Sequence, residues 1–328
     1  MQPSVLHASV LSAVLIFATL APNAGTAAPG QGVQIQPTDD RVRVEIDGQV
    51  FTEYYFTNVP RPFLYPLVGP HGLNLTRDYP MKETPGEVRD HPHHRSFWVG
   101  HGAVNGHDCW AEGNKSGRIL HERFTRLESG KDAGVIATRN TWVSVDGKPL
   151  CHDERTLRFH RPTKAGEWLI DLDITWLATQ GPLTLGDTKE GTIALRLSET
   201  MRLTKSPDRT EILNSNNDRN AATWGKRAKW CDYSGPIQDK IVGVAIFDHP
   251  SNPRHPTWWH VRDYGLFAAN PFGKHDFENL KENKTAGDLE LPAGGSVTFR
   301  YRFFLHAGNA AQAKVAEKYD QYTAGALK

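Results

Sequence analysis

Two long stretches of alternating side chains limit what this chain can fold into. In 167–177 (EWLIDLDITWL) every second residue is large and apolar, with Leu169 the one exception on the polar face, and 296–306 (SVTFRYRFFLH) repeats the pattern. Successive side chains of a strand point to opposite faces, so each stretch has one apolar and one polar face. The pattern predicts antiparallel strands covered on one face. Further strands are predicted at 42–46, 134–145, 192–197 and 242–247.

Helical periodicity is confined to the C-terminal end. Within 309–322, apolar residues recur at helical spacing at Ala311, Val315 and Tyr319. Many antiparallel strands with one terminal helix predict a mainly β fold, a large antiparallel β-sandwich, rather than a parallel α/β fold. Turn sequences separate the strands, but no Pro- or Gly-rich linker divides the chain. Residues 29–328 are therefore expected to form a single β-sandwich domain.

The N-terminal 28 residues differ from the rest. They contain no Lys, Arg, Asp or Glu, and 10–21 is an apolar run of signal-peptide length followed by small residues near Ala27 and Ala28. We expect 1–28 to be a signal peptide and the protein to be periplasmic or secreted. No later segment approaches the roughly 18 apolar residues of a transmembrane helix. A formal net charge of +1 without basic runs argues against a nucleic-acid partner.

Residues suited to proton transfer are concentrated in the histidine-rich segment 89–110. Imidazole titrates near neutral pH, so His91, His93 and His101 are candidate catalytic groups, one of which would supply the proton donor. Glu190 lies between glycines on a predicted turn before a strand, where a carboxylate can project into a cleft, and it is the candidate base. The alternative for Glu190 is a solvated turn carboxylate.

Arginine and aromatic side chains near the histidines suit a saccharide or another polyhydroxylated small molecule. Indole rings can cover the apolar face of a pyranose, while guanidinium and amide groups bind hydroxyls or a carboxylate. Ion pairs for the arginines and core packing for the tryptophans are the alternatives. The candidate substrate-binding residues are Arg95, Trp98, Asn105, Trp110, His249, Arg254, His260 and Arg262.

The same histidines permit a single divalent metal ion. Three convergent imidazoles suffice for zinc, copper or iron. In an extended segment His91 and His93 face one way, and His101, His249 or His260 is a candidate third ligand. No H-E-x-x-H helix and no C-x-x-C pair of cysteines is present, so a metal stays an alternative and no cofactor is predicted.

Several motifs together resemble a known family. They are DHPHHRSFWVGHGAVNGHDCW (90–110), GDTKEG (186–191), CDYSGP (231–236), FDHPSNPRHPTWWHVRDYGLFAANPFG (247–273) and LPAGGSVTFRYRF (291–303). They are similar to bacterial PmoA-like proteins, a largely uncharacterised family also called methane oxygenase. The resemblance implies an exported protein of polysaccharide-degrading bacteria and a β-sandwich similar to galactose-mutarotase-like domains.

These observations predict an exported carbohydrate-active enzyme of the epimerase, lyase or hydrolase type. Its acid–base chemistry would use histidine and glutamate in a cleft rich in histidine and tryptophan. Two alternatives stay open: a metal-dependent oxygenase or hydrolase built on the histidine cluster, and a non-catalytic sugar-binding sandwich. The sequence contains no G-x-S-x-G nucleophile elbow, phosphate-binding loop or dinucleotide fingerprint.

Overall fold

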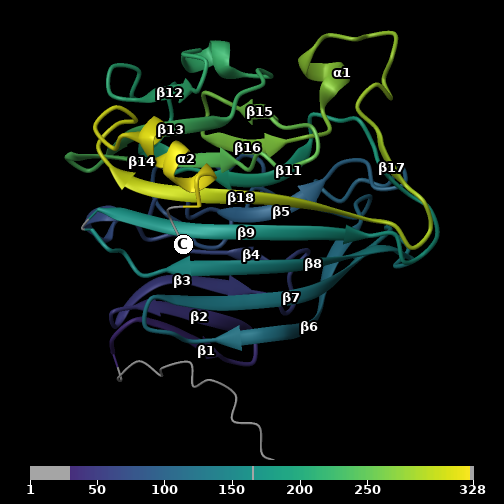
Figure 1. Cartoon of the computed structure of the whole chain (residues 1–328), viewed down its shortest axis with the longest axis horizontal. Helices are drawn as coiled ribbons and strands as arrows, with labels where there is room; N and C mark the ends of the chain where they lie inside the picture. Colours follow the sequence, from purple (N-terminus) through teal and green to yellow (C-terminus); the bar gives the residue numbers. More distant parts are fainter. Residues whose placement is uncertain (1–29, 165, 326–328) are drawn as a thin grey trace, which may run out of the picture.

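The computed structural model describes residues 30–164 and 166–325, so the predicted signal peptide lies outside the described residues. Within these ranges the chain forms two large antiparallel sheets, seen as two layers in Figure 1. The first sheet contains, in spatial order, β1 (Val33–Pro37), β2 (Arg41–Ile46), β3 (Gln49–Tyr55), β4 (Phe63–Leu64), β5 (Phe97–His101), β11 (Gly191–Arg196), β16 (Leu266–Asn270) and β15 (Trp258–Val261).

The second sheet contains, in spatial order, β12 (Glu211–Asn214), β13 (Trp230–Ile237), β14 (Lys240–Asp248), β18 (Ser296–Ala307), β9 (Glu167–Leu177), β8 (Pro149–His160), β7 (Ala133–Val143) and β6 (Arg118–Glu128). A short separate pair joins β10 (Leu183–Leu185) to β17 (Leu289–Leu291). The helices are α1 (Lys274–Phe277) and α2 (Val315–Thr323), and short 3-10 turns occupy Pro70–Gly72, Glu199–Met201 and Asn220–Thr223.

The two alternating stretches pair with each other at the centre of the second sheet. β9 and β18 run antiparallel in continuous register from the pair Glu167–His306 to the pair Leu177–Ser296. Their apolar faces enter one buried cluster, the main core, which also contains first-sheet residues such as Val42 and Ile193. The two sheets therefore pack face to face, and the predicted mainly β antiparallel sandwich with a C-terminal helix is confirmed.

Leu169, the exception on the polar face of β9, packs against a second apolar cluster beneath α2. The predicted helix is confirmed only in its second half, because α2 begins at Val315. Asn309 and Gln312 accept each other's backbone N–H groups at 3.0 Å and close a separate turn. Lys314 then adopts a φ of 55°, in the left-handed region, so the helix cannot extend back through it.

The outer face of the first sheet carries a cross-strand row that underlies the candidate site. Phe63, Trp98, Ala194, Ala268 and His260 are successive register partners on β4, β5, β11, β16 and β15. Trp98 and the two alanines belong to an apolar cluster separate from the main core, so this face points away from the sandwich interior. The two small alanines leave the sheet surface low between Trp98 and His260.

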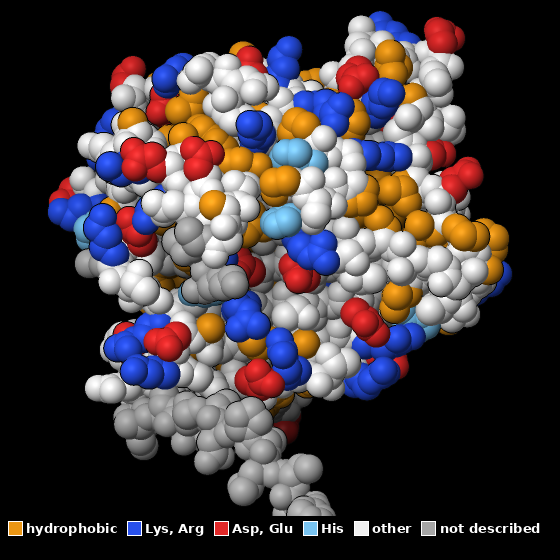
Figure 2. Space-filling model, in the orientation of Figure 1, with side chains coloured by type: hydrophobic (Ala, Val, Ile, Leu, Met, Phe, Trp, Pro, Cys, Tyr) orange, Lys and Arg blue, Asp and Glu red, His pale blue; other side chains and the backbone are white. Residues whose placement is uncertain are grey.

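The molecular surface carries both signs of charge. Figure 2 shows acidic and basic side chains intermingled over one face, with neither sign dominating it. In residues 30–164 and 166–325, no helix is long and apolar enough to cross a bilayer. Cys109, Cys151 and Cys231 are buried free thiols.

A substitution at Gly243 on β14 would test how tightly the second sheet is packed. It lies in register between Ser234 and His306, and a Cβ there would stand 2.7 Å from the His306 Nε2 and 2.9 Å from the Ser234 Cβ. The imidazole cannot easily move, because its Nε2 is bound to the Asp232 carboxylate at 2.6 Å. We expect Gly243→Ala to lower the free energy of unfolding by about 1–3 kcal/mol, measured by urea denaturation. An unchanged denaturation midpoint would contradict this packing.

Candidate functional site

A cleft of about 320 Å³ opens over the outer face of the first sheet, a volume within the range of small-molecule sites. Four separate segments form it: the loops before and after β5, the turn before β11, and the end of β15 with the turn that follows. The lining residues are His91, His93, His94, Asp108, Trp110, Ala111, Lys189, Glu190, His260, Arg262 and Tyr264.

A column of stacked rings forms one wall of the cleft. The Tyr264 ring lies 5.3 Å from that of His91, His91 lies 4.7 Å from His94, and His94 lies 5.1 Å from Trp98, with interplanar angles of 8°, 11° and 21°. Such stacking adds to the stability gained from burial. Because Trp98 is on β5 and Tyr264 follows β15, the column ties the histidine loop to two strands. His91 has a φ of 43°, a strained conformation for a residue with a Cβ.

His94 is fixed in one tautomer at the base of the loop. The Nη1 of Arg196 donates to the His94 Nδ1 at 2.9 Å, so the ring proton is on Nε2. Burial, together with the neighbouring His93 and Arg196, holds the pKa of His94 far below its ordinary value. Arg196 and Arg77 also donate to the same Asp90 oxygen, at 2.6 and 2.5 Å. His94 therefore positions the loop and remains neutral.

His93 and His260 present neutral imidazoles to the cleft. Burial lowers the pKa of His93 to about 4, and the nearby Arg61 charge adds to the effect. Burial likewise lowers the pKa of His260 to about 3, with the Arg262 charge adding to it. The His260 Nδ1 has no hydrogen-bond partner among the described residues. At neutral pH both rings are uncharged, so neither is an imidazolium that donates a proton.

The acidic groups of the cleft are partly engaged. Glu190 is 41% exposed on the turn before β11, and its carboxylate lies 3.5 Å from the Nζ of Lys189. Asp108 accepts the backbone N–H groups of Trp110 and Ala111 through Oδ1, at 2.7 and 3.0 Å. Burial raises the pKa of the Tyr264 hydroxyl, which therefore stays protonated at neutral pH. The cleft thus holds proton acceptors together with one phenolic donor.

The structure brings part of the predicted site together in this cleft. The predicted residues that line it are His91, His93, Trp110, Glu190, His260 and Arg262. Sequence reasoning did not select Tyr264, Asp108 or Lys189 as site residues. Tyr264 had a signal, since His260, Arg262 and Tyr264 alternate at the end of a strand and such residues share one face.

Other predicted residues serve the fold. His101, a predicted catalytic group, is 0% exposed and does not line the cleft, and its Nε2 binds the carbonyl of Gly186 at 2.9 Å. Arg95 donates to both carboxylate oxygens of Glu112 at 2.8 Å, and it does not line the cleft. The guanidinium of Arg254 donates to backbone carbonyls, including that of Asp288 at 2.6 Å.

Three more predicted binding residues lie away from the ligand space. The Asn105 side chain accepts the backbone N–H of Thr184 at 2.7 Å and orders a loop. Trp98 is 1% exposed and supports the ring column from below. His249 binds Ser251 at 2.7 Å and packs against Tyr322 of α2. His249 therefore does not line the cleft with His91 and His93.

The residues present do not fit the metal ion that was considered as an alternative. In the described part of the chain, no group of three or more His, Cys, Asp or Glu side chains is arranged to hold a metal. Both nitrogens of His94 are committed, since Nδ1 accepts from Arg196 and Nε2 carries the proton. Of the candidate third ligands, His249 lies beside α2, His101 is buried against the carbonyl of Gly186, and His260 lines the cleft.

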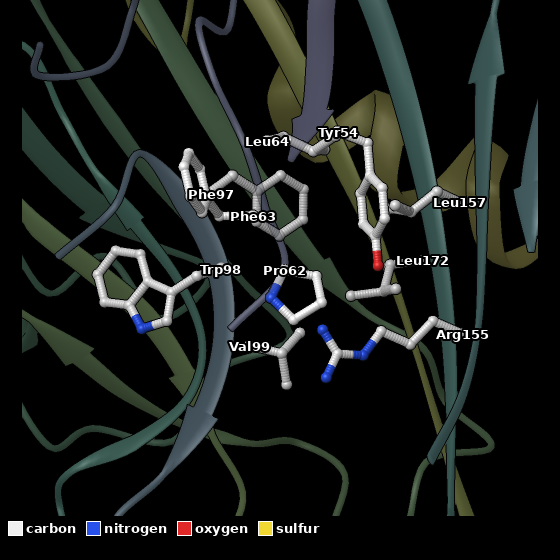
Figure 3. Close-up of a pocket in the computed structure, with 10 residues that line it drawn as sticks. All are labelled: Tyr54, Pro62, Phe63, Leu64, Phe97, Trp98, Val99, Arg155, Leu157 and Leu172. Atoms are coloured by element: carbon white, nitrogen blue, oxygen red, sulfur yellow. The ribbon is translucent and has the colours of Figure 1, made fainter. Parts of the chain in front are cut away.

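A small cavity between the sheets does not form another site. Figure 3 shows its lining residues, Tyr54, Pro62, Phe63, Leu64, Phe97, Trp98, Val99, Arg155, Leu157 and Leu172. Its volume of about 20 Å³ holds little more than one water molecule. The one charged side chain, Arg155, is already bound at 2.8 and 2.7 Å to both carboxylate oxygens of Asp153.

The structural role of His101 gives a pH-dependent prediction. Burial lowers its pKa from 6.5 to about 4, so the unfolded chain takes up a proton that the folded chain resists. The contribution of neutral His101 to the free energy of unfolding is therefore fully present above pH 6.5. It is lost as the pH falls through about 4. His101→Gln keeps an N–H donor but does not titrate. We expect its unfolding free energy to fall less steeply with decreasing pH, by up to about 1.4 kcal/mol per pH unit, in urea titrations. Identical slopes would contradict the assignment.

Among solved structures, a mutant of the heparan sulfate lyase HepC from Pedobacter heparinus matches at 12% identity and a TM-score of 0.37, covering 86% of this chain and 38% of that one. The α-galactosidase from Lactobacillus brevis matches at 10% identity and a TM-score of 0.38, and the match covers 85% of this chain and 39% of that one. A galactose mutarotase related enzyme from Lactobacillus acidophilus matches at 10% identity and a TM-score of 0.30, and the match covers 84% of this chain and 97% of that one. This chain thus spans about two fifths of the length of the first two proteins. No curated protein matches it in sequence.

The family match corrects one expectation from the sequence. Residues 41–320 match a family described as a family of unknown function, DUF6807. The predicted membership of the PmoA-like, or methane oxygenase, family is therefore wrong, since the family found carries no such assignment. Because the match spans most of the chain, the protein belongs to the DUF6807 family of unknown function.

Proposed function

We propose that this protein is a carbohydrate-active enzyme that transfers protons on a saccharide bound in the histidine-rich cleft. The observation that carries the proposal is the meeting of neutral imidazoles, a carboxylate and a phenol in one cleft beside aromatic rings. These groups come from three separate segments of the chain: the loop before β5, the turn before β11, and the end of β15 with the turn that follows. Such convergence of ionisable groups with perturbed pKa values is typical of sites that move protons.

Aromatic and polar groups alternate around the cleft in a way that suits a sugar. Tyr264 ends the ring column and supplies apolar surface for a pyranose ring. Glu190 and Lys189 supply polar groups for its hydroxyls. A saccharide presents both kinds of surface at once, which supports it over a purely apolar ligand.

The protonation states support a particular division of roles. With a pKa of about 4, His93 is unprotonated at neutral pH and accepts a proton from the substrate. Tyr264, whose pKa burial raises, retains its proton and is the donor. Glu190 is a second acceptor, at the exposed side of the cleft. This reverses the prediction from sequence that a histidine donates the proton.

Proton transfer of this kind supports an epimerase or lyase over a glycosidase. A glycosidase normally uses two opposed carboxylates. The carboxylates that line the cleft are Asp108 and Glu190, and Asp108 Oδ1 is already held by two backbone N–H groups. Abstraction of a proton from carbon needs only an acceptor, a donor and a group that stabilises the developing negative charge.

Export after removal of residues 1–28 is also part of the proposal. It predicts that the protein recovered from the periplasm or the culture medium begins near residue 29. N-terminal sequencing of that fraction measures this. Recovery of the intact N-terminus in the cytoplasmic fraction would contradict export.

The catalytic roles give a direct test. Glu190→Gln and His93→Gln should each lower kcat at least about 100-fold, because each removes a proton acceptor. Turnover is followed as solvent deuterium incorporation or product formation by NMR, across a panel of mono- and oligosaccharides. His249→Gln is the matched control, since His249 lies outside the cleft and should leave turnover unchanged. Saturable sugar binding without product under any condition would instead support a non-catalytic sugar-binding sandwich.

The metal alternative has its own measurement. We expect purified protein to contain well below one equivalent of zinc, copper or iron by elemental mass spectrometry. The reason is that Arg196 occupies the His94 Nδ1 and that His249 lies away from the cleft. One equivalent of metal that disappears in a His91→Ala/His93→Ala variant would overturn this expectation and favour a metal-dependent enzyme.

A further inference from the structure

Arg262 lines the cleft as a cation without a polar partner in the described part of the protein. It follows β15, and no hydrogen bond or ion pair joins its guanidinium to another described residue. Its contacts are with two aromatic rings: the guanidinium carbon lies 5.9 Å from the Trp224 ring centroid and 5.4 Å from that of Tyr264. These contacts hold the side chain in place while its N–H donors stay free.

The neighbouring arginines differ from Arg262, because their guanidinium groups do have polar partners. Arg61 donates to the backbone carbonyls of Trp110 and Ala111 at 2.6 and 2.8 Å. Arg95 is paired with Glu112, and Arg196 binds His94 and Asp90. Each of these arginines builds the walls of the cleft, whereas Arg262 has donors left for a ligand.

Neither acidic side chain of the cleft is paired with Arg262 in the place that a ligand would occupy. Glu190 is paired with Lys189, and Asp108 accepts two backbone N–H groups. His93 and His260 are uncharged at neutral pH, so they neither repel nor replace an incoming anion. Arg262 is therefore a cleft-lining cation whose N–H donors no described residue takes, so they are left for a ligand.

We infer that the cleft takes an acidic saccharide and that Arg262 binds its carboxylate through two parallel N–H···O hydrogen bonds. This inference rests on the proposed function and specifies the substrate class. A planar guanidinium matches the two oxygens of a carboxylate, as in a uronic acid. A sulfate ester offers oxygens to the same fork, so the experiment compares the two anions directly. A carboxylate held next to the neutral imidazoles also places the adjacent C–H bond near a proton acceptor.

The test measures binding by calorimetry with matched ligands. The probes are D-glucuronate and D-galacturonate, their neutral counterparts D-glucose and D-galactose, and D-glucose 6-sulfate, each also as short oligosaccharides where solubility permits. The wild-type protein should bind uronates at least about tenfold more tightly than the neutral sugars. Arg262→Gln should remove that preference and leave neutral-sugar affinity within about twofold, and Arg262→Lys should restore part of it.

The matched control is Arg118→Gln on β6. Arg118 is an exposed arginine whose guanidinium has no hydrogen bond or ion pair to another described residue, so its loss should change no affinity. If Arg262→Gln proves poorly folded by circular dichroism, the salt dependence of the wild-type protein replaces it. Uronate affinity should then fall several-fold between 50 and 300 mM NaCl, while neutral-sugar affinity stays constant.

The outcomes separate this inference from the proposed function. Equal affinity for neutral and acidic sugars, with turnover of the neutral ones, overturns the acidic substrate and leaves the proposed enzyme in place. Tighter binding of the sulfate ester than of either uronate overturns the carboxylate assignment. The absence of binding and of product with every sugar overturns the proposed function together with the inference.

Discussion

The contact between Arg196 and the histidine loop is the interaction on which the candidate site depends. Arg196 is a fully buried side chain on β11, and it binds both the Asp90 carboxylate and the His94 ring. Burial lowers the pKa of Arg196 to about 10, so it remains charged at neutral pH. Arg77, also fully buried, shares Asp90. Without Asp90 two buried guanidinium groups would lose their counter-ion, which is strongly destabilising. The same contacts therefore fix the position of the histidine loop and balance the charges beneath the cleft.

The first sheet supplies the platform for this arrangement. Trp98 on β5 carries the ring column, and His260 on β15 forms the opposite wall. Between them lie Ala194 and Ala268, which are too small to fill the space above the sheet. The apolar faces of the same strands enter the main core. The site thus rests on rigid strands, and loops supply most of its ionisable groups, a division common among binding and catalytic sites.

Burial sets the chemistry of the cleft more than local sequence does. His93 and His260 are kept neutral because an imidazolium ion would lose hydration there, and nearby guanidinium groups reinforce the effect. Histidines crowded in sequence suggested a metal centre or proton donors. In the folded protein these two are uncharged at neutral pH, while Tyr264 retains its phenolic proton. The substrate chemistry we propose follows from these protonation states together with the free guanidinium of Arg262.

Much of the fold could be predicted from the sequence because strand alternation is a local pattern. β9 occupies Glu167–Leu177, the predicted stretch, since its apolar residues repeat at the period of a strand. The helix was predicted too long because helical spacing alone did not register the Asn309–Gln312 turn. The crowding of histidines in 89–110 likewise located the cleft.

The roles of individual residues depend on partners far away in the sequence. Arg95, Arg254 and Arg262 look alike in the sequence, yet the first pairs with Glu112, the second binds backbone carbonyls and the third stays available. By itself the sequence determined the alternation of the strands and the segment that carries the site. Only the tertiary structure decided which charges are neutralised, because hydrogen bonds and ion pairs form between groups that folding brings within about 3 Å.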